Sequence, residues 1–132
     1  MAKTFGYDST TDEVLEGVDL TGKSALVTGV SAGLGVETCR VLVAHGAEVV
    51  GTARDLGKSK RALEAAMGPA ASKVALVEAD LASLKSTRKA ADQLLAQGKK
   101  FDAIIANAGV MACPQGKTAD GFETQFGTNH LG

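Results

Sequence analysis

The residues best suited to chemistry lie in a glycine-rich stretch near the start of the chain, Leu26 to Gly35. A short apolar run, Ala25 to Val27, leads into it, and glycines follow at positions 29, 33 and 35 before a segment of helix formers. This order is typical of a strand, a tight turn and the N-terminus of a helix. Such a helix end binds phosphate through unpaired N–H groups, and glycines let the phosphate come close. A glycine-rich turn in another kind of α/β protein would give the same pattern.

The composition of the 132 residues is that of one ordinary globular domain, with 45% apolar and 22% charged residues. A net charge of −1 gives no electrostatic footprint for nucleic acid or an anionic membrane, and no apolar run is long enough to cross a bilayer. The two cysteines, Cys39 and Cys113, are far apart, which fits a reducing compartment. With no signal-peptide pattern at the N-terminus, we expect a cytoplasmic protein.

The elements that position the glycine turn alternate between strand and helix. Residues 23–28, 47–53, 73–79 and 101–106 are predicted strands, and residues 35–45, 57–67, 83–97 and 121–132 are predicted helices. This alternation predicts an α/β Rossmann-type fold, a parallel sheet of strand order 3-2-1-4 with helices on both faces. Residues 1–22 form a polar preamble, and residues 23–132 form the domain.

Four smaller expectations concern local structure. Thr10 and Glu13 fit a capping box for a short helix with a structural role, such as covering a sheet edge. Cys39 is expected to fill a packed helix face, and His45 to cap the end of that helix. The apolar run from Ala103 to Ala106 predicts a strand buried on both faces.

Polar and glycine residues collect at the carboxyl ends of the predicted strands, where parallel sheets bind ligands. Arg54 follows the second strand, where NAD-binding folds place an acidic residue, and its planar fork could pair with a ribose 2′-phosphate. Lys58 could add to that charge. A solvated loop arginine is the alternative.

Asp80 ends the third strand and could accept a hydrogen bond from an adenine amino group, or it could simply form the turn before the next helix. The segment Asn107-Ala108-Gly109 ends the fourth strand. Its small residues allow a cofactor to approach the backbone, although a plain strand-to-loop turn would need the same residues.

Four motifs now occur in the order and spacing of a known family: Thr28-Gly29-xxx-Gly33-Leu34-Gly35, Asp80-Leu81, Asn107-Ala108-Gly109 and Asn129-His130-Leu131-Gly132. Together they resemble the short-chain dehydrogenase/reductase family, over residues 20–132 but only across the N-terminal half of its fold. The Asn129 motif and the run Asn107 to Met111 resemble its retinol-dehydrogenase-like and protochlorophyllide-reductase-like branch. The resemblance implies that a dinucleotide cofactor contacts a defined set of residues: Gly29, Ser31, Ala32, Gly33, Leu34, Gly35, Arg54, Asp80, Leu81, Asn107, Ala108 and Gly109.

The resemblance also bears on which dinucleotide is bound. The family's position for an NAD-selecting aspartate falls at Ala53, and an arginine at position 54 is similar to its NADP-preferring members. The usual extra basic residue before the second motif glycine is absent, since Ala32 stands there. NADP is therefore expected, with NAD the less favoured alternative.

The family's catalytic residues are largely missing. Its hydride chemistry uses a tyrosine, a lysine four residues later, a serine and an asparagine, because a phenol of ordinary pKa needs help near neutral pH. The one tyrosine here, Tyr7, is followed four residues later by Thr11, so only Asn129 matches the catalytic set. We expect a truncated reductase that binds its cofactor without turnover, a carbonyl or alcohol substrate being used only by a full-length parent. An exposed fourth strand then predicts self-association through the sheet edge.

Other classes of protein fit less well. A catalytically silent or self-associating module is compatible with the same residues. A methyltransferase would prefer an acidic residue where Arg54 stands. A receiver-like or flavin-binding α/β domain is a further alternative, and a receiver would need an acidic cluster at the strand ends, which is absent here. No metal site is expected, because His130 and Cys113 have no third ligand at a useful spacing.

Overall fold

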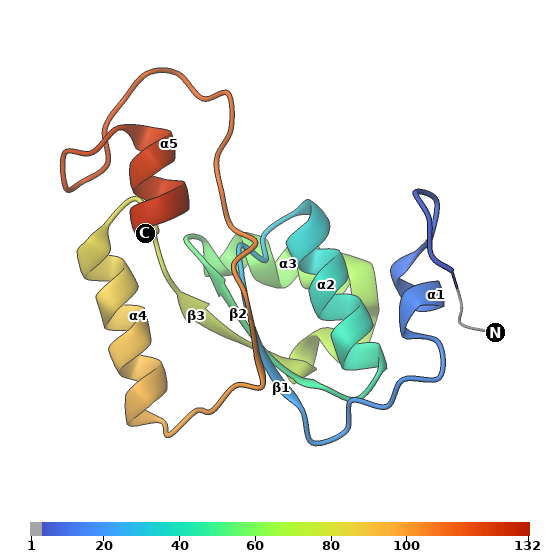
Figure 1. Cartoon of the computed structure of the whole chain (residues 1–132). Helices are drawn as coiled ribbons and strands as arrows, with labels where there is room; N and C mark the ends of the chain where they lie inside the picture. Colours follow the sequence, from blue (N-terminus) through green and yellow to red (C-terminus); the bar gives the residue numbers. More distant parts are fainter. Residues whose placement is uncertain (1–3) are drawn as a thin grey trace.

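The computed structural model describes residues 4–132 and is built on a parallel sheet of four strands (Figure 1). These are β1 (Ser24–Thr28), β2 (Glu48–Ala53), β3 (Val74–Glu78) and β4 (Ala103–Ile105). Their order is β3-β2-β1-β4, which confirms the predicted fold class and strand order. The central strand β2 is buried from its second residue onward, as expected of a parallel strand covered on both faces.

Helices cover both faces of the sheet. The helices α2 (Gly33–Ala44) and α3 (Leu56–Met67) lie on one face, and α4 (Leu84–Ala96) lies on the other (Figure 1). Neighbouring residues of a strand point to opposite faces, so Val49 joins the core under α2 and α3 while Val50 joins the core under α4. Cys39 is fully buried in the first core, which confirms its packing role, and burial raises the pKa of its thiol to about 11.

Side chains cap the ends of most helices. Asp55 accepts a hydrogen bond from the Lys58 N–H (2.8 Å) at the start of α3, and Ser83 accepts one from the Ser86 N–H (3.4 Å) at the start of α4. His45 is the C-cap of α2, as predicted, and its Nδ1 lies 2.9 Å from the Val18 carbonyl oxygen. A short 3₁₀ helix, η1 (Gly68–Lys73), joins α3 to β3.

The last part of the chain is a loop followed by a short irregular helix. The predicted helix over 121–132 forms only over α5 (Thr124–Phe126) and the π-type turn η2 (Gly127–Leu131). It starts late because Glu123 is its N-cap, and the carboxylate accepts hydrogen bonds from the N–H groups of Gln125 and Phe126. These bonds lower the pKa of Glu123.

Strand β4 lies at the sheet edge, as expected of an exposed fourth strand, but it is shorter than predicted and its faces are not buried. The predicted burial of the Ala103–Ala106 run is wrong, because Ile104 is 68% exposed and Ala103 is exposed as well. Within residues 4–132, β4 pairs with β1 alone, and it lies at one edge of the sheet.

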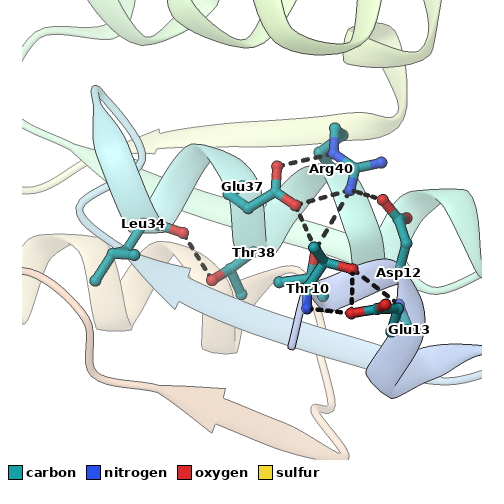
Figure 2. Close-up of polar contacts among 8 residues, drawn as sticks. Thr10, Asp12, Glu13, Leu34, Glu37, Thr38 and Arg40 are labelled. Atoms are coloured by element: carbon teal, nitrogen blue, oxygen red, sulfur yellow. Dashed lines mark hydrogen bonds and ion pairs between the residues drawn. The ribbon is translucent and has the colours of Figure 1, made fainter. Parts of the chain in front are cut away.

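The N-terminal helix α1 (Thr11–Leu15) lies beside α2 rather than at a sheet edge, so that expectation is wrong (Figure 1). Its capping box between Thr10 and Glu13 is present as predicted. Polar contacts explain its position, and the Thr11 hydroxyl donates to Glu37. Arg40 forms ion pairs with Glu37 (2.7 Å) and Asp12 (2.8 Å) (Figure 2).

These contacts make the attachment of α1 pH-dependent. Hydrogen bonds from Arg40 and Thr11 lower the pKa of Glu37 from 4.5 to about 2. A lowered carboxyl pKa contributes stability that is fully present above pH 4.5 and is lost as the pH falls towards 2. We therefore expect Glu37→Gln to lower the melting temperature by about 1–4 °C at pH 7, with a difference that shrinks as the pH falls through this window.

Thermal unfolding followed by circular dichroism at several pH values checks this expectation. Glu64→Gln is the control, because Glu64 pairs only loosely with Lys60 (4.0 Å) on the exposed side of α3. A Glu37→Gln deficit that is the same at pH 3 and pH 7 would contradict the assigned role of the carboxylate.

Candidate functional site

The glycine turn between β1 and α2 depends on two very close backbone contacts. Gly29 has φ +75°, and a Cβ at this residue would lie 2.7 Å from the Cα of Ala108. A Cβ at Gly35 would lie 2.2 Å from the carbonyl oxygen of Gly29. Both distances are too short for any side chain, so the turn requires glycine at both positions.

Asn107 ties the end of β4 to the same turn. Its side-chain Nδ2 donates to the carbonyl oxygens of Thr28 (2.9 Å) and Gly29 (3.2 Å). The Ala108 N–H donates to the Thr28 hydroxyl (2.9 Å). The backbone that leaves β4 is therefore held against the backbone that leaves β1.

The N-terminus of α2 has no side-chain cap. Its N-cap residue is Ala32, which offers no hydrogen-bond acceptor, whereas α3 and α4 are capped by Asp55 and Ser83. The first N–H groups of a helix need partners, and they carry the positive end of the helix dipole. An anion bound at this helix end would satisfy both requirements.

A cleft of about 450 Å³ opens along the carboxyl ends of the strands, next to this helix end. All but one of the predicted cofactor-binding residues line it: Gly29, Ser31, Ala32, Leu34, Gly35, Arg54, Asp80, Leu81, Asn107, Ala108 and Gly109. The exception, Gly33, is the first residue of α2. The fold thus brings together predicted residues that are separated by up to 80 positions in the sequence, as Gly29 and Gly109 are.

The charge at the β2 end of the cleft is positive. Arg54 and Lys58 both line the cleft, and both are exposed. The neighbouring carboxylate of Asp55 accepts the Lys58 N–H and so caps α3. Two side-chain cations are therefore available to a ligand at this corner, whereas the carboxylate of Asp55 is engaged as the N-cap of α3.

Asp80 forms the turn that was one of the two roles considered for it, and its role towards adenine stays a prediction. Its carboxylate accepts the Ala82 N–H (3.0 Å), and its own N–H donates to the Ser86 hydroxyl (3.0 Å), as a turn residue would. It also lines the cleft together with Leu81. Forming the turn leaves further lone pairs of this carboxylate for a ligand.

Asn129, the one match to the catalytic set, is not among the residues that line the cleft. Its side-chain oxygen accepts the Val110 N–H (2.8 Å), and its Nδ2 donates to the Val110 carbonyl (2.7 Å). The side chain therefore holds the backbone beyond β4 in place, and its catalytic role stays a prediction.

The cleft also includes residues that the motifs did not indicate: Thr52, Asp55, Ala79 and Thr128. The first three lie at or just beyond strand ends, and the rule that ligands bind there could have found them. No sequence rule indicated Thr128, because its segment reaches the cleft only through tertiary contacts.

Three further observations concern features outside this cleft. A hollow of about 530 Å³ lies beside η1 and the start of β3, at the end of the sheet opposite to the glycine turn. Among residues 4–132, no three His, Cys, Asp or Glu side chains are arranged to hold a metal ion. None of the helices within that range is long and apolar enough to cross a membrane.

Comparison with known proteins agrees with this geometry. The family model described as short chain dehydrogenase matches residues 23–132, so the chain belongs to the short-chain dehydrogenase/reductase family. It is 46% identical over 110 residues to the short-chain dehydrogenase/reductase prx1 of Penicillium rubens and 45% identical over 116 residues to mouse retinol dehydrogenase 12. These matches cover 83% and 87% of this chain but 32% and 37% of the relatives. The chain therefore spans about a third of the length of those relatives.

Solved structures show the same partial match. An uncharacterised protein from Mycobacterium paratuberculosis superposes with a TM-score of 0.72 at 38% identity, over 86% of this chain and 39% of that protein. The N-domain of a bacterial malonyl-CoA reductase, solved with NADP, superposes with a TM-score of 0.59 at 33% identity. That match covers 69% of this chain and 17% of the reductase chain.

The close contact at Gly35 gives a direct test of the turn. We expect Gly35→Ala to lower the free energy of unfolding by about 1–3 kcal/mol, because its methyl group must push the Gly29 carbonyl away. Gly57→Ala is the matched control, since the atom nearest to a new Cβ there would be 3.4 Å away and its helix favours alanine. Urea unfolding measures both, and a Gly35→Ala variant as stable as Gly57→Ala would contradict the packing described.

Proposed function

We propose that this chain is the NADP(H)-binding portion of an alcohol or carbonyl oxidoreductase of the short-chain dehydrogenase/reductase family. The observation that carries the proposal is the uncapped N-terminus of α2, which opens onto the same cleft as the cation Arg54. The helix end suits the pyrophosphate, and the arginine suits a second anionic group some distance along the ligand. A dinucleotide with a 2′-phosphate has both groups.

Two features favour NADP over NAD. NAD-binding folds use a carboxylate at the end of the second strand to hold the ribose hydroxyls, and here Ala53 stands at that end. The next carboxylate, Asp55, is engaged as the cap of α3. The similarity to a reductase domain solved with NADP supports the same choice.

We propose that the 132-residue chain binds the cofactor without turnover. Its one tyrosine, Tyr7, has no lysine four residues later, so the family's proton donor has no counterpart in this sequence. Asn129 alone matches the catalytic set, and in our proposal it positions the backbone beside the cofactor through Val110. The alternative is a module that is catalytically silent and serves only to bind or to self-associate. Two unpaired cysteines, Cys39 and Cys113, support the cytoplasm as its compartment.

A titration with each reduced cofactor tests the proposal. We expect NADPH to bind more tightly than NADH, and Arg54→Ala to weaken NADPH binding about tenfold to a hundredfold, because a charged hydrogen-bonded pair is lost. Binding of NADH should change little in this variant. Isothermal titration calorimetry measures all of these affinities.

Arg88→Ala is the matched control, because Arg88 belongs to α4 and does not line the cleft. Equal weakening by Arg54→Ala and Arg88→Ala, or a preference for NADH, would overturn the NADP assignment. Consumption of NADPH on addition of an aldehyde, with formation of the matching alcohol, would overturn the absence of turnover.

We also propose that the chain self-associates through β4. The strand pairs with β1 on one side, and its Ile104 side chain is 68% exposed. Exposed apolar edge strands pair with other chains, and natural proteins block such edges with charge, lysine above all.

Light scattering coupled to size-exclusion chromatography tests the role of this edge. The wild-type chain should elute with a mass above that of one 13.4 kDa chain, and Ile104→Lys should shift it to that mass. Val14→Lys, which changes an exposed apolar residue of α1, serves as the control and should leave the mass unchanged. A wild-type monomer, or an Ile104→Lys variant of unchanged mass, would refute the proposal.

A further inference from the structure

One polar side chain at the cleft has no partner. Thr128 is 9% exposed and lines the cleft, and its hydroxyl oxygen is buried without a hydrogen bond to any residue within 4–132. It is the one buried side-chain oxygen or nitrogen in that range with no partner. An unpaired buried hydroxyl costs free energy, so its persistence beside a cleft points to a partner that arrives with a ligand.

Other helical hydroxyls of the chain show what Thr128 lacks. Those of Thr38, Ser59 and Thr87 each bond the carbonyl four residues earlier, at 2.7, 2.9 and 3.3 Å. This is the usual way in which a helix satisfies a serine or threonine. Thr128 lies in the π-type turn η2 and makes no such bond.

The position of Thr128 indicates which part of a ligand it meets. Its segment is held at one end by Asn129, which bonds Val110 beyond β4. At the other end, a Cβ at Gly132 would lie 2.2 Å from the Leu81 carbonyl oxygen, so the segment lies directly against the chain that leaves β3. Thr128 thus belongs to the cleft wall between the ends of β3 and β4.

Under the proposed function, the anionic groups of the ligand would occupy other parts of the cleft. The uncapped end of α2 lies at the end of β1, and Arg54 and Lys58 lie at the end of β2. With phosphates at both places, the nucleoside that joins them extends towards Asp80 and Leu81. This arrangement places the base near Leu81, against which the segment of Thr128 lies.

We propose that the Thr128 hydroxyl forms a hydrogen bond with the adenosine half of the bound dinucleotide. This inference rests on the proposed function and adds a specific binding residue to it. A threonine exchanges its hydroxyl and methyl positions by rotation about one bond, so a ligand can recruit the hydroxyl without moving the backbone. The hydroxyl can donate or accept, and adenosine offers both kinds of partner.

The probe is adenosine 2′,5′-bisphosphate, which carries the adenine, the ribose and two phosphates but no nicotinamide. Thr128→Val keeps the shape of the side chain and removes the hydroxyl. We expect it to weaken binding of this probe and of NADPH by the same factor, about tenfold. Thr128→Ser, which keeps the hydroxyl, should bind about as well as the wild type.

Stability separates a binding role from a structural one. Thr128→Val removes an unpaired buried hydroxyl, so the free variant should melt at or above the wild-type temperature. Thr118→Val is the control: Thr118 is also buried, its hydroxyl accepts the Phe122 N–H (3.3 Å), and it does not line the cleft. The Thr118→Val variant should have a lower melting temperature than the wild type and an unchanged affinity for the probe and for NADPH.

Each remaining outcome has a definite meaning. If the wild type binds the probe and Thr128→Val binds it equally well, the inference fails and the proposed function stands. If Thr128→Val weakens NADPH but not the probe, the hydroxyl meets the other half of the cofactor, and the assignment is wrong. If Thr128→Val melts lower by as much as Thr118→Val, its role is structural. If the wild type binds neither molecule, the proposed function fails, and the inference fails with it.

Discussion

The contact on which the site depends is the close approach of three backbones around Gly29. The β4 exit at Ala108 packs against Gly29, α2 begins at Gly33 and passes Gly35 against the Gly29 carbonyl, and Asn107 bonds that same carbonyl. Two hydrogens in place of Cβ atoms make this approach possible. Because the three segments are fixed together, the uncapped helix end and the strand ends face one cleft.

Hydrogen bonds hold the backbones together at this contact, whereas apolar packing holds the helices against the sheet. Two cores, one on each face of the sheet, hold α2 and α3 on one side and α4 on the other. They determine where the helices lie. The hydrogen bonds of Asn107 and Asn129 then determine where the irregular backbone beyond β4 lies relative to the sheet.

The sequence was sufficient for most of the fold because the signals are local. Apolar runs, glycine stops and capping residues such as Thr10 and Ser83 specify strands and helices within a few residues. The parallel topology then predicts that the carboxyl ends of the strands meet at one edge. Those ends, with the glycine turn, supply nearly all of the residues that line the cleft. What the sequence could not supply depends on tertiary contacts: the position of α1 follows from its bonds to Glu37 and Arg40, and the place of Thr128 follows from a segment that folds back. The exposure of the Ile104 side chain likewise depends on which elements lie over β4. The apolar run of that strand does not specify those elements.

The alanine at position 32 has a further consequence for the dynamics of the free protein. Without a cap, the first turn of α2 is the part of that helix whose amides are least well held, while the turns behind it are anchored in the core. Local opening should therefore concentrate at the residues that we propose bind an anion. Occupation of the cleft would close this fraying end, so that amide hydrogen exchange in the first turn reports directly on whether the site is filled.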